Sequence, residues 1–434
     1  MTLTHKNVKI ALGSGAMPLG ELAYTRDGRR EHSTFAYDAT WLHDTATRFA
    51  ISPDLPLVAG NQFRKAPSRD DSTLHFAFAD TEPDGWGCRV IARDRAKRRN
   101  AARNDGNALS APELNELDYL LGVDDVSRIG AIRLSDPDSG TFLRAMEDTD
   151  RGTPPLIELS QLMAASRAVE TNTETESDLR YLRGRGTSIG GMRPKCTVVD
   201  DDGHLAIGKF PSVSDDRCVT RGEVLALHLA GVAGIVVADS RVVMSDDIPV
   251  ALIRRFDRVS GGGRIPYLSA SSMLQASRQE DHAYTQIAQS IIANSVNPGQ
   301  DLQELWRRLA FNLLITNVDD HLQNHGFLHV EHGQWRLAPA FDLNPFPDKD
   351  PVLKLWLDEA YGPVDSIEAV IDAAVYFRLN AADVRRVLGD LVAAIEGWKT
   401  VAKSPAVGMS DRDIDDFTPA FDNRQMRIAK ALLK

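Results

Sequence analysis

Three side chains that could hold a metal ion and accept a proton lie in one short stretch of the chain, Asn312–Phe346. Asp319 is followed five positions later by Asn324, and Asp342 follows an aromatic residue after a short alternating segment. Phosphoryl transfer needs a carboxylate that accepts the hydroxyl proton, and oxygen ligands that place Mg²⁺ on the nucleotide phosphates. This spacing is typical of a kinase catalytic loop and its metal-binding aspartate, so it predicts Asp319 as base and Asn324 and Asp342 as metal ligands.

Other chemistry is open to the same stretch. Asp320 and His321 could be the active pair on spacing alone, and an Asp-Asp pair at the end of a helix is often only a cap. The stretch also contains four histidines, a residue type that commonly binds zinc, namely His321, His325, His329 and His332. They alternate with turn and strand residues and give no convergent ligand set, so we do not expect a zinc site.

A glycine-rich stretch, Gly184–Gly191, lies directly before a predicted strand. Glycines allow backbone N–H groups to approach phosphate oxygens, and Arg185, Arg193 and Lys195 add positive charge. The alternative is a plain surface turn, but the lysine-bearing strand that follows favours phosphate binding.

Lys209 lies in the second predicted strand after the glycine-rich stretch, the short apolar strand Leu205–Phe210, where an unpaired lysine would be costly to bury. In a kinase such a lysine holds the α- and β-phosphates and pairs with a glutamate on a helix, here Glu223 in the predicted helix Arg221–Gly231. The alternatives are a lysine exposed on an edge strand and a glutamate stabilised at a helix start. Two strands, a helix and a third strand follow the order of a kinase upper lobe.

The length and charge of the chain limit the classes of function. A chain of 434 residues predicts two or three domains. A formal net charge of −11 argues against autonomous nucleic-acid binding. No run of about 18 apolar residues and no secretory signal occur, and an odd number of cysteines (three) suits a reduced protein. We therefore expect a soluble cytoplasmic protein that does not enter a membrane.

The predicted fold class is α+β, with three domains. Residues 1–145 form a small α/β N-terminal subdomain, residues 146–300 a kinase-like upper lobe, and residues 301–434 a mainly helical lobe. The polar segment 171–177 shows no sign of a packed core, and Tyr284, Trp306 and Trp335 are predicted core residues.

In this order, the motifs resemble those of the HipA-type serine/threonine kinases, which are toxins of type II toxin–antitoxin systems. The segments Phe76–Gly85 and Asp118–Leu134 are similar to the N-terminal subdomain of this family, and Thr187–Lys195 to its phosphate loop. Ile207–Pro211 resembles the ATP-lysine strand and Arg254–Arg258 the hinge.

The resemblance implies ATP and Mg²⁺ as cofactors, Asp319 as general base, and Asn324 and Asp342 as metal ligands. It places autophosphorylation at Ser188, where a phosphate would compete with the nucleotide; Thr187 is the alternative hydroxyl. It implies the Lys209–Glu223 ion pair. The residues that it implies beside the nucleotide are Gly190, Gly191, Met192, Arg193, Lys195, Lys209, Arg254, Arg255, Phe256, His321, Asn324 and Phe341.

The resemblance also implies partners. The substrate would be an aminoacyl-tRNA synthetase, typically that for glutamate, and a small DNA-binding HipB-type antitoxin would supply the only contact with nucleic acid. Two other functions stay open, an inactive kinase-like scaffold that holds a repressor and a small-molecule kinase.

Overall fold

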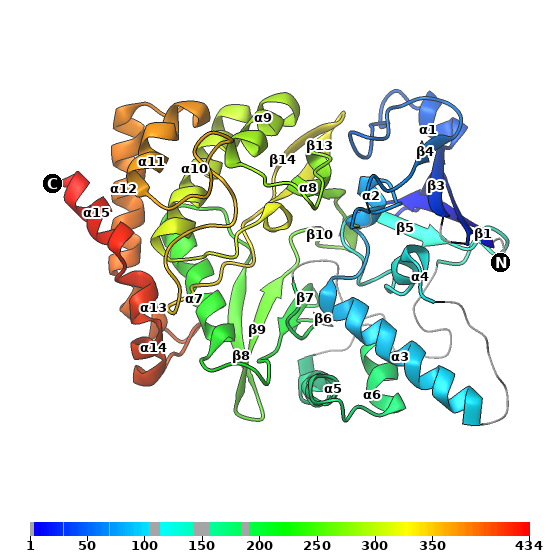
Figure 1. Ribbon diagram of the computed structural model, residues 1–434, viewed down its shortest axis with the longest axis horizontal. Helices are drawn as coiled ribbons and strands as arrows, with labels where there is room; N and C mark the ends of the chain where they lie inside the picture. Colours follow the sequence, from blue (N-terminus) through cyan, green and yellow to red (C-terminus); the bar gives the residue numbers. More distant parts are fainter. Residues whose placement is uncertain (1–3, 29, 69, 105–112, 143–155, 184–190) are drawn as a thin grey trace. The chain divides into compact units, whose positions relative to one another are not determined.

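The computed structural model describes residues 4–28, 30–68, 70–104, 113–142, 156–183 and 191–434. The chain forms two compact units (Figure 1). Unit 1 comprises residues 1–214 and 257–268, and unit 2 comprises residues 215–256 and 269–434. The predicted division into three domains is finer than this and stays a prediction.

Unit 1 begins with a five-stranded antiparallel sheet in the order β4-β3-β2-β1-β5. On β1, Val8 and Ile10 are buried and Lys9 between them is exposed, which is the period-2 pattern of a half-buried strand. The mostly apolar run Val8–Leu12 and the alternating segment Met17–Tyr24 predict a hairpin, and the pairing of β1 with β2 confirms it. The strands are β1 (Thr4–Leu12), β2 (Met17–Asp27), β3 (Arg30–Tyr37), β4 (Gln62–Arg64) and β5 (Ile132–Ser135).

Helices and a hairpin complete unit 1. The basic segment Val90–Asn104 predicts a helix, which the structure confirms and which begins earlier, at Gly85. The predicted strand pair is the hairpin β6 (Lys195–Val199) and β7 (Leu205–Lys209). The other elements are α1 (Ala39–His43), α2 (Phe76–Ala79), α3 (Gly85–Asn104), α4 (Glu116–Leu121), η1 (Leu156–Glu158), α5 (Leu159–Thr171), α6 (Glu176–Leu182), β10 (Arg258–Val259), β11 (Gly263–Arg264) and β12 (Tyr267–Ser269), whose last residue belongs to unit 2.

The polar segment 171–177 is exposed at every position except Glu174. Glu174 is buried and lies 3.5 Å from Arg93 and 4.0 Å from Lys97, both on α3. Thr175 caps α6 by accepting from the amide of Asp178. Two polar side chains of this exposed stretch therefore have structural roles, one as an ion-pair partner and one as a helix cap.

The part of the predicted hinge that follows Phe256 is tied to the N-terminal region inside unit 1. The buried Asp257 accepts from the Gly130 amide at 2.7 Å, and Arg258 donates to the carbonyls of Gly130 and Arg128. These charge-assisted bonds fix residues distant in sequence, so this segment belongs to unit 1 although its neighbours on both sides belong to unit 2.

Unit 2 is mainly helical, and its core surrounds α10, whose Leu305, Leu309 and Leu313 are fully buried. Helices α11 and α12 pack against α10, and α15 packs against α12 (orange to red in Figure 1). The elements are α7 (Val219–Val232), β8 (Ser240–Ser245), β9 (Ile248–Arg254), α8 (Ala270–Met273), α9 (Tyr284–Asn294), α10 (Pro298–Leu314), η2 (Leu322–Asn324), β13 (Gly326–Glu331), β14 (Gln334–Leu337), α11 (Ile367–Asp372), η3 (Ala373–Phe377), α12 (Ala381–Glu396), α13 (Trp398–Ala402), α14 (Asp411–Phe421) and α15 (Arg424–Leu433).

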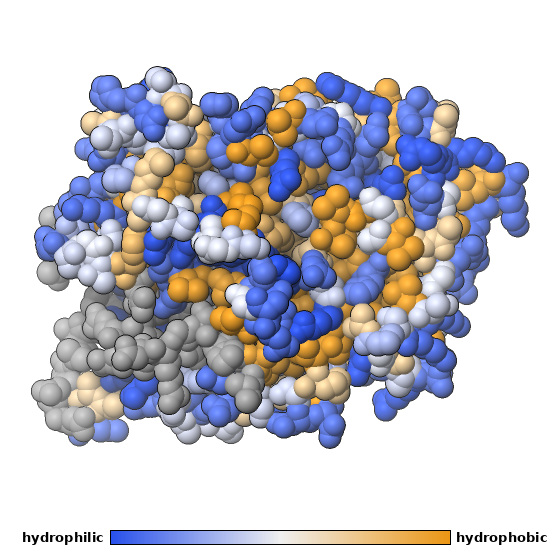
Figure 2. Space-filling model, turned by 180° about the vertical axis from the view of Figure 1, so that it is seen from behind, coloured by the Kyte–Doolittle hydropathy of each residue, from blue (hydrophilic) through white to orange (hydrophobic). Residues whose placement is uncertain are grey.

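The predicted α+β class is confirmed, because helices and strands both build the chain. Tyr284, Trp306 and Trp335 are core residues, as predicted. On the face shown in Figure 2, hydrophobic residues are interspersed with hydrophilic ones. Within the described ranges, none of the helices combines the length and the apolar character that crossing a membrane requires.

Candidate active site

The predicted catalytic loop begins where α10 ends in unit 2. After Leu314 the backbone turns at Thr316, whose φ of 58° lies in the left-handed region and cannot continue the helix. Asn423, the N-cap of α15, donates to the Leu314 carbonyl at 2.7 Å and to the Thr316 hydroxyl at 3.1 Å. A distant side chain thereby satisfies the helix end and fixes the start of the loop.

The two adjacent aspartates of the loop differ sharply in their surroundings. Asp320 is 1% exposed, whereas the Asp319 side chain is 48% exposed. Asp320 accepts from the Tyr284 hydroxyl and lies 3.1 Å from His325 Nε2. Burial alone would raise the pKa of Asp320, but the charge and hydrogen bond of His325 and the bond from Tyr284 hold it below its usual value. Asp320 is thus an anchored internal carboxylate, and Asp319 is the one that a substrate can reach.

Buried amides extend this anchor along the loop. Asn312 donates to the Tyr284 hydroxyl at 3.3 Å, and Asn317 donates to Asn312 Oδ1 at 3.1 Å. The side-chain oxygen of Asn317 in turn accepts from the amide of Asn344 at 3.2 Å. Because buried polar groups must be paired, this chain of bonds restricts the loop to one conformation.

The same chain reaches the predicted metal ligand Asp342. Asn344 Nδ2 donates to Asp342 Oδ1 at 3.1 Å. Asp342 has a φ of 57°, which is a costly conformation for a residue other than glycine. Strained residues of this kind persist where the surrounding structure holds them, and they cluster at functional sites.

The predicted second ligand, Asn324, fits a metal by its own bonding. Its Nδ2 donates to the Asp319 carbonyl at 3.2 Å. In the described part of the chain this buried Oδ1 has no hydrogen-bond partner. An amide oxygen and a carboxylate are hard ligands, and Mg²⁺ usually takes only a few protein ligands together with phosphate oxygens and water. Asn324 and Asp342 therefore suit Mg²⁺.

The histidines of the stretch have other surroundings. His325 is buried and lies 3.1 Å from Asp320. The pKa of His329 is lowered to about 4, mainly by burial and to a smaller extent by the charge of His332. His321, a predicted nucleotide neighbour, precedes η2 and is half-buried. Among the residues with described positions, no group of three or more His, Cys, Asp or Glu side chains could hold a metal ion.

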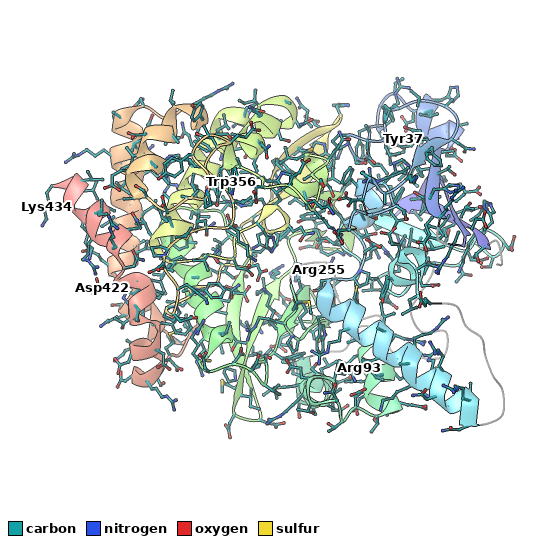
Figure 3. The ribbon with its side chains drawn as sticks, in the orientation of Figure 1. Tyr37, Arg93, Arg255, Trp356, Asp422 and Lys434 are labelled. Carbon is teal, nitrogen blue, oxygen red and sulfur yellow. The ribbon has the colours of Figure 1, made fainter. Side chains whose placement is uncertain are left out.

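Two residues predicted to lie beside the nucleotide meet in unit 2. The rings of Phe256 and Phe341 lie 5.4 Å apart between centroids. Arg254 ends β9 and donates its amide to the Asp239 carbonyl, and Arg255, labelled in Figure 3, is buried. The structure thus brings together the end of the predicted hinge strand and the aromatic residue that precedes Asp342.

Within unit 1, Lys195, a predicted nucleotide neighbour, is buried beside Asp84. Its Nζ lies 2.8 Å from Asp84 Oδ2 and donates to the Gly191 carbonyl at 3.1 Å, and the side chain is 1% exposed. Lys209 faces Lys195 in the β6–β7 register and is also buried. Burial raises the pKa of Asp84 to about 6, although the charges of Lys195 and Lys209 and the Gly87 amide oppose the rise. Asp84 thus counterbalances two buried cations.

Replacing Lys195 by Ala is expected to lower the free energy of unfolding by about 3–5 kcal/mol near pH 7, because the buried Asp84 loses its cation. Because the pKa of Asp84 is raised, the folded protein binds a proton at this carboxylate more tightly than the unfolded protein does. The contribution of Asp84 to the free energy of unfolding therefore falls as pH rises from about 4 to about 6. The loss in Lys195→Ala should therefore be smaller at about pH 5 than at about pH 7. Thermal unfolding at both values measures it, with the exposed Lys9→Ala as control. Equal losses at both values would contradict the role of Asp84.

The remaining predicted residues have the following positions. Gly191 and Met192 are exposed and Arg193 is half-buried, whereas Thr187, Ser188 and Gly190 lie outside the described residues. Glu223 is buried on α7. The ion pair of Lys209 with Glu223 stays a prediction.

Three residues that contact the predicted site residues were not themselves predicted from the sequence. Asp84 lies in a Pro-Asp-Gly turn, which by itself indicates only a bend. Asn344 follows Asp342 by two residues and has no distinctive pattern. The ammonium of Lys354 donates to Asp319 Oδ1. Lys354 lies between leucines in an alternating segment, and this alternation is the feature of the sequence that could have indicated an outward-facing lysine.

Comparison with known protein families gives two matches. Residues 187–398 match the family described as HipA-like C-terminal domain, and residues 12–111 match the HipA N-terminal domain. Together the two matched ranges cover most of the chain, and they appear in the order that the motifs predict.

Individual proteins are similar over shorter or longer ranges. A Sinorhizobium fredii protein named "Putative kinase Y4mE" is 24% identical over 419 residues, which covers 89% of this chain and 83% of that protein. A Haemophilus influenzae protein named "Putative kinase" is 23% identical over 188 residues, covering 38% of this chain and 55% of that protein.

A solved structure has the same fold along nearly the whole chain. It is the Shewanella oneidensis HipA chain in a complex with HipB and operator DNA, with a TM-score of 0.69 and 16% identity. The match covers 98% of this chain and 99% of that one. At this identity the likeness establishes the fold.

Proposed function

The chain belongs to the HipA family, and from that premise we propose that it is an ATP- and Mg²⁺-dependent kinase with Asp319 as its general base. The observation that carries the proposal is the contrast within the loop. Asp320 is buried and bonded, and it holds the backbone so that Asp319 presents a half-exposed carboxylate. A general base must reach the proton that it accepts, and Asp319 meets that requirement.

The proposed metal ligands are Asn324 and Asp342. Mg²⁺, when bound, neutralises charge on the phosphates and orients the transferred group. The amide oxygen of Asn324, which has no hydrogen-bond partner among the described residues, and the backbone conformation of Asp342 support this assignment. The protein's own contribution is to hold both oxygens in place through the Asn317 and Asn344 bonds.

We further propose that Gly190–Arg193 and Lys209 bind the nucleotide phosphates. Because Lys195 is engaged with Asp84 and the Gly191 carbonyl, its proposed part is to shape this loop. Phe256 and Phe341 are proposed to lie beside the adenine ring of the nucleotide.

The proposed acceptor is a serine or threonine of a protein, with an aminoacyl-tRNA synthetase as the candidate implied by the family. Autophosphorylation at Ser188 is proposed in addition. The kinase names of the two relatives support phosphotransfer itself. The HipA structure solved with HipB and operator DNA supports a proposed antitoxin partner of the HipB type, with nucleic acid bound through that partner.

Incubation with Mg²⁺ and ATP labelled on its γ-phosphate tests the proposal directly. Purified protein alone and protein with a cell lysate are compared, and the expected result is label on a lysate protein and on the kinase itself. Ser188→Ala should remove the label on the kinase and leave that on the lysate protein. Label confined to a metabolite would identify a small-molecule kinase. No transfer under any condition, with retained binding of a HipB-type protein, would identify a scaffold instead.

A further inference from the structure

We propose that Lys354 is a further catalytic residue, a cation that contacts both Asp319 and the transferred phosphoryl group. This inference rests on the proposed kinase function and adds a residue that none of the predicted roles includes. It concerns unit 2 alone, which contains Asp319 and Lys354.

The sequence around Lys354 explains why its side chain faces outward. Leu353, Leu355 and Leu357 are each less than 5% exposed, whereas the Lys354 side chain is 63% exposed. Residues in an extended chain point alternately to opposite sides, so burying the three leucines turns Lys354 toward solvent. Trp356, labelled in Figure 3, marks this segment.

Backbone bonds hold the segment next to the catalytic loop. The Lys354 amide donates to the Val318 carbonyl at 3.2 Å, one residue before Asp319. The Leu353 amide donates to Val364 at 2.8 Å, and the Trp356 amide to His282 at 2.9 Å. The main chain thus places Lys354 beside Asp319, and its Nζ donates to Asp319 Oδ1.

Stability does not explain this arrangement. Both side chains are about half exposed, and exposed ion pairs contribute roughly 0–1 kcal/mol. Between Asp319 and Asn324 the loop itself has no lysine or arginine. Lys354 therefore supplies the permanent positive charge at the proposed base.

Such a charge meets a requirement of the chemistry. The substrate hydroxyl oxygen forms a bond to the γ-phosphorus while the bond from that phosphorus to the β,γ-bridging oxygen breaks, and ADP leaves with the electron pair. The hydroxyl proton goes to Asp319. The carboxylate and the phosphoryl group are both negative, so their approach is repulsive unless a cation lies between them. Lys354 has three N–H donors, of which one binds Asp319 Oδ1, and the others suit phosphoryl oxygens. Asp319 Oδ2 then accepts the proton.

Lys354→Ala tests this role in the full-length protein. The expected result is a fall in kcat of about 100-fold, with an unchanged melting temperature. Lys354→Arg should restore most of the rate, because it keeps the charge. Lys354→Ala should also lose the preference for a non-hydrolysable ATP analogue over ADP in binding measurements, since only the former presents a γ-phosphate.

Lys349→Ala is the matched control, because Lys349 is similarly exposed and lies five residues earlier. It should keep wild-type rates and nucleotide preference. Wild-type kcat in Lys354→Ala would overturn the inference and leave the kinase function standing. A higher kcat would also overturn it, because Lys354 would then obstruct the base. A wild-type protein that neither binds nor turns over Mg-ATP would overturn the proposed function and this inference together.

Discussion

Asp319→Asn is expected to lower kcat for phosphotransfer about 10³-fold, within the range that general-base catalysis contributes. Asparagine has nearly the same shape but cannot accept the hydroxyl proton. Because the side chain is half exposed and its ion pair with Lys354 is on the surface, the fold should be unaffected. Initial rates with labelled ATP, together with far-UV circular dichroism and a melting curve, measure both effects.

Asp350→Asn is the matched control, since Asp350 is an exposed aspartate on the neighbouring segment of unit 2. It should retain the wild-type rate. An Asp319→Asn protein with near-normal activity would place the base elsewhere and contradict the proposed role.

Asp320→Asn is expected to have the opposite profile, with a large loss of stability. The substitution removes the charge that faces His325 and one acceptor of the Tyr284 hydroxyl in a fully buried network. Breaking a buried pair by changing one partner costs about 3–5 kcal/mol. Denaturant unfolding followed by fluorescence measures the loss, and the same Asp350→Asn protein serves as control.

The pH dependence of this loss follows from the lowered pKa of Asp320. A carboxylate whose pKa is lower in the folded than in the unfolded state stabilises the protein above the unfolded value, and this stability disappears as pH falls through the folded value. The difference between wild type and Asp320→Asn should therefore be constant from about pH 7 to about pH 5 and shrink below about pH 4. A difference that grew on acidification would contradict the assignment of Asp320 as an internal anion.

Together the two variants separate chemistry from architecture at adjacent positions. Spacing along the chain could not make this distinction, because both aspartates follow the same helix. Their roles depend on Tyr284 and His325, which come from α9 and from the residue after η2, and on the depth at which each carboxylate lies.

Much of this protein was determined by the sequence alone. Periodicity is local, so the sheet hairpin, the basic helix α3, the strand pair β6–β7 and the long helix α10 could be predicted from alternating or helical apolar patterns. The order of the glycine-rich loop, the lysine strand, the Asp319–Asn324 loop and Asp342 was also sufficient to indicate the HipA family, because each motif needs particular residue types at particular intervals.

What only the tertiary structure decided are the pairings between distant residues. Asp84 pairs with Lys195, more than a hundred positions later, and Glu174 is buried against α3. Lys354 follows the β13–β14 hairpin in sequence and donates to Asp319, which precedes that hairpin. Each pairing depends on burial and charge in three dimensions, which spacing does not contain. The proposed catalytic loop was therefore predictable as a motif, whereas the difference between Asp319 and Asp320 and the cation beside the proposed base required the fold.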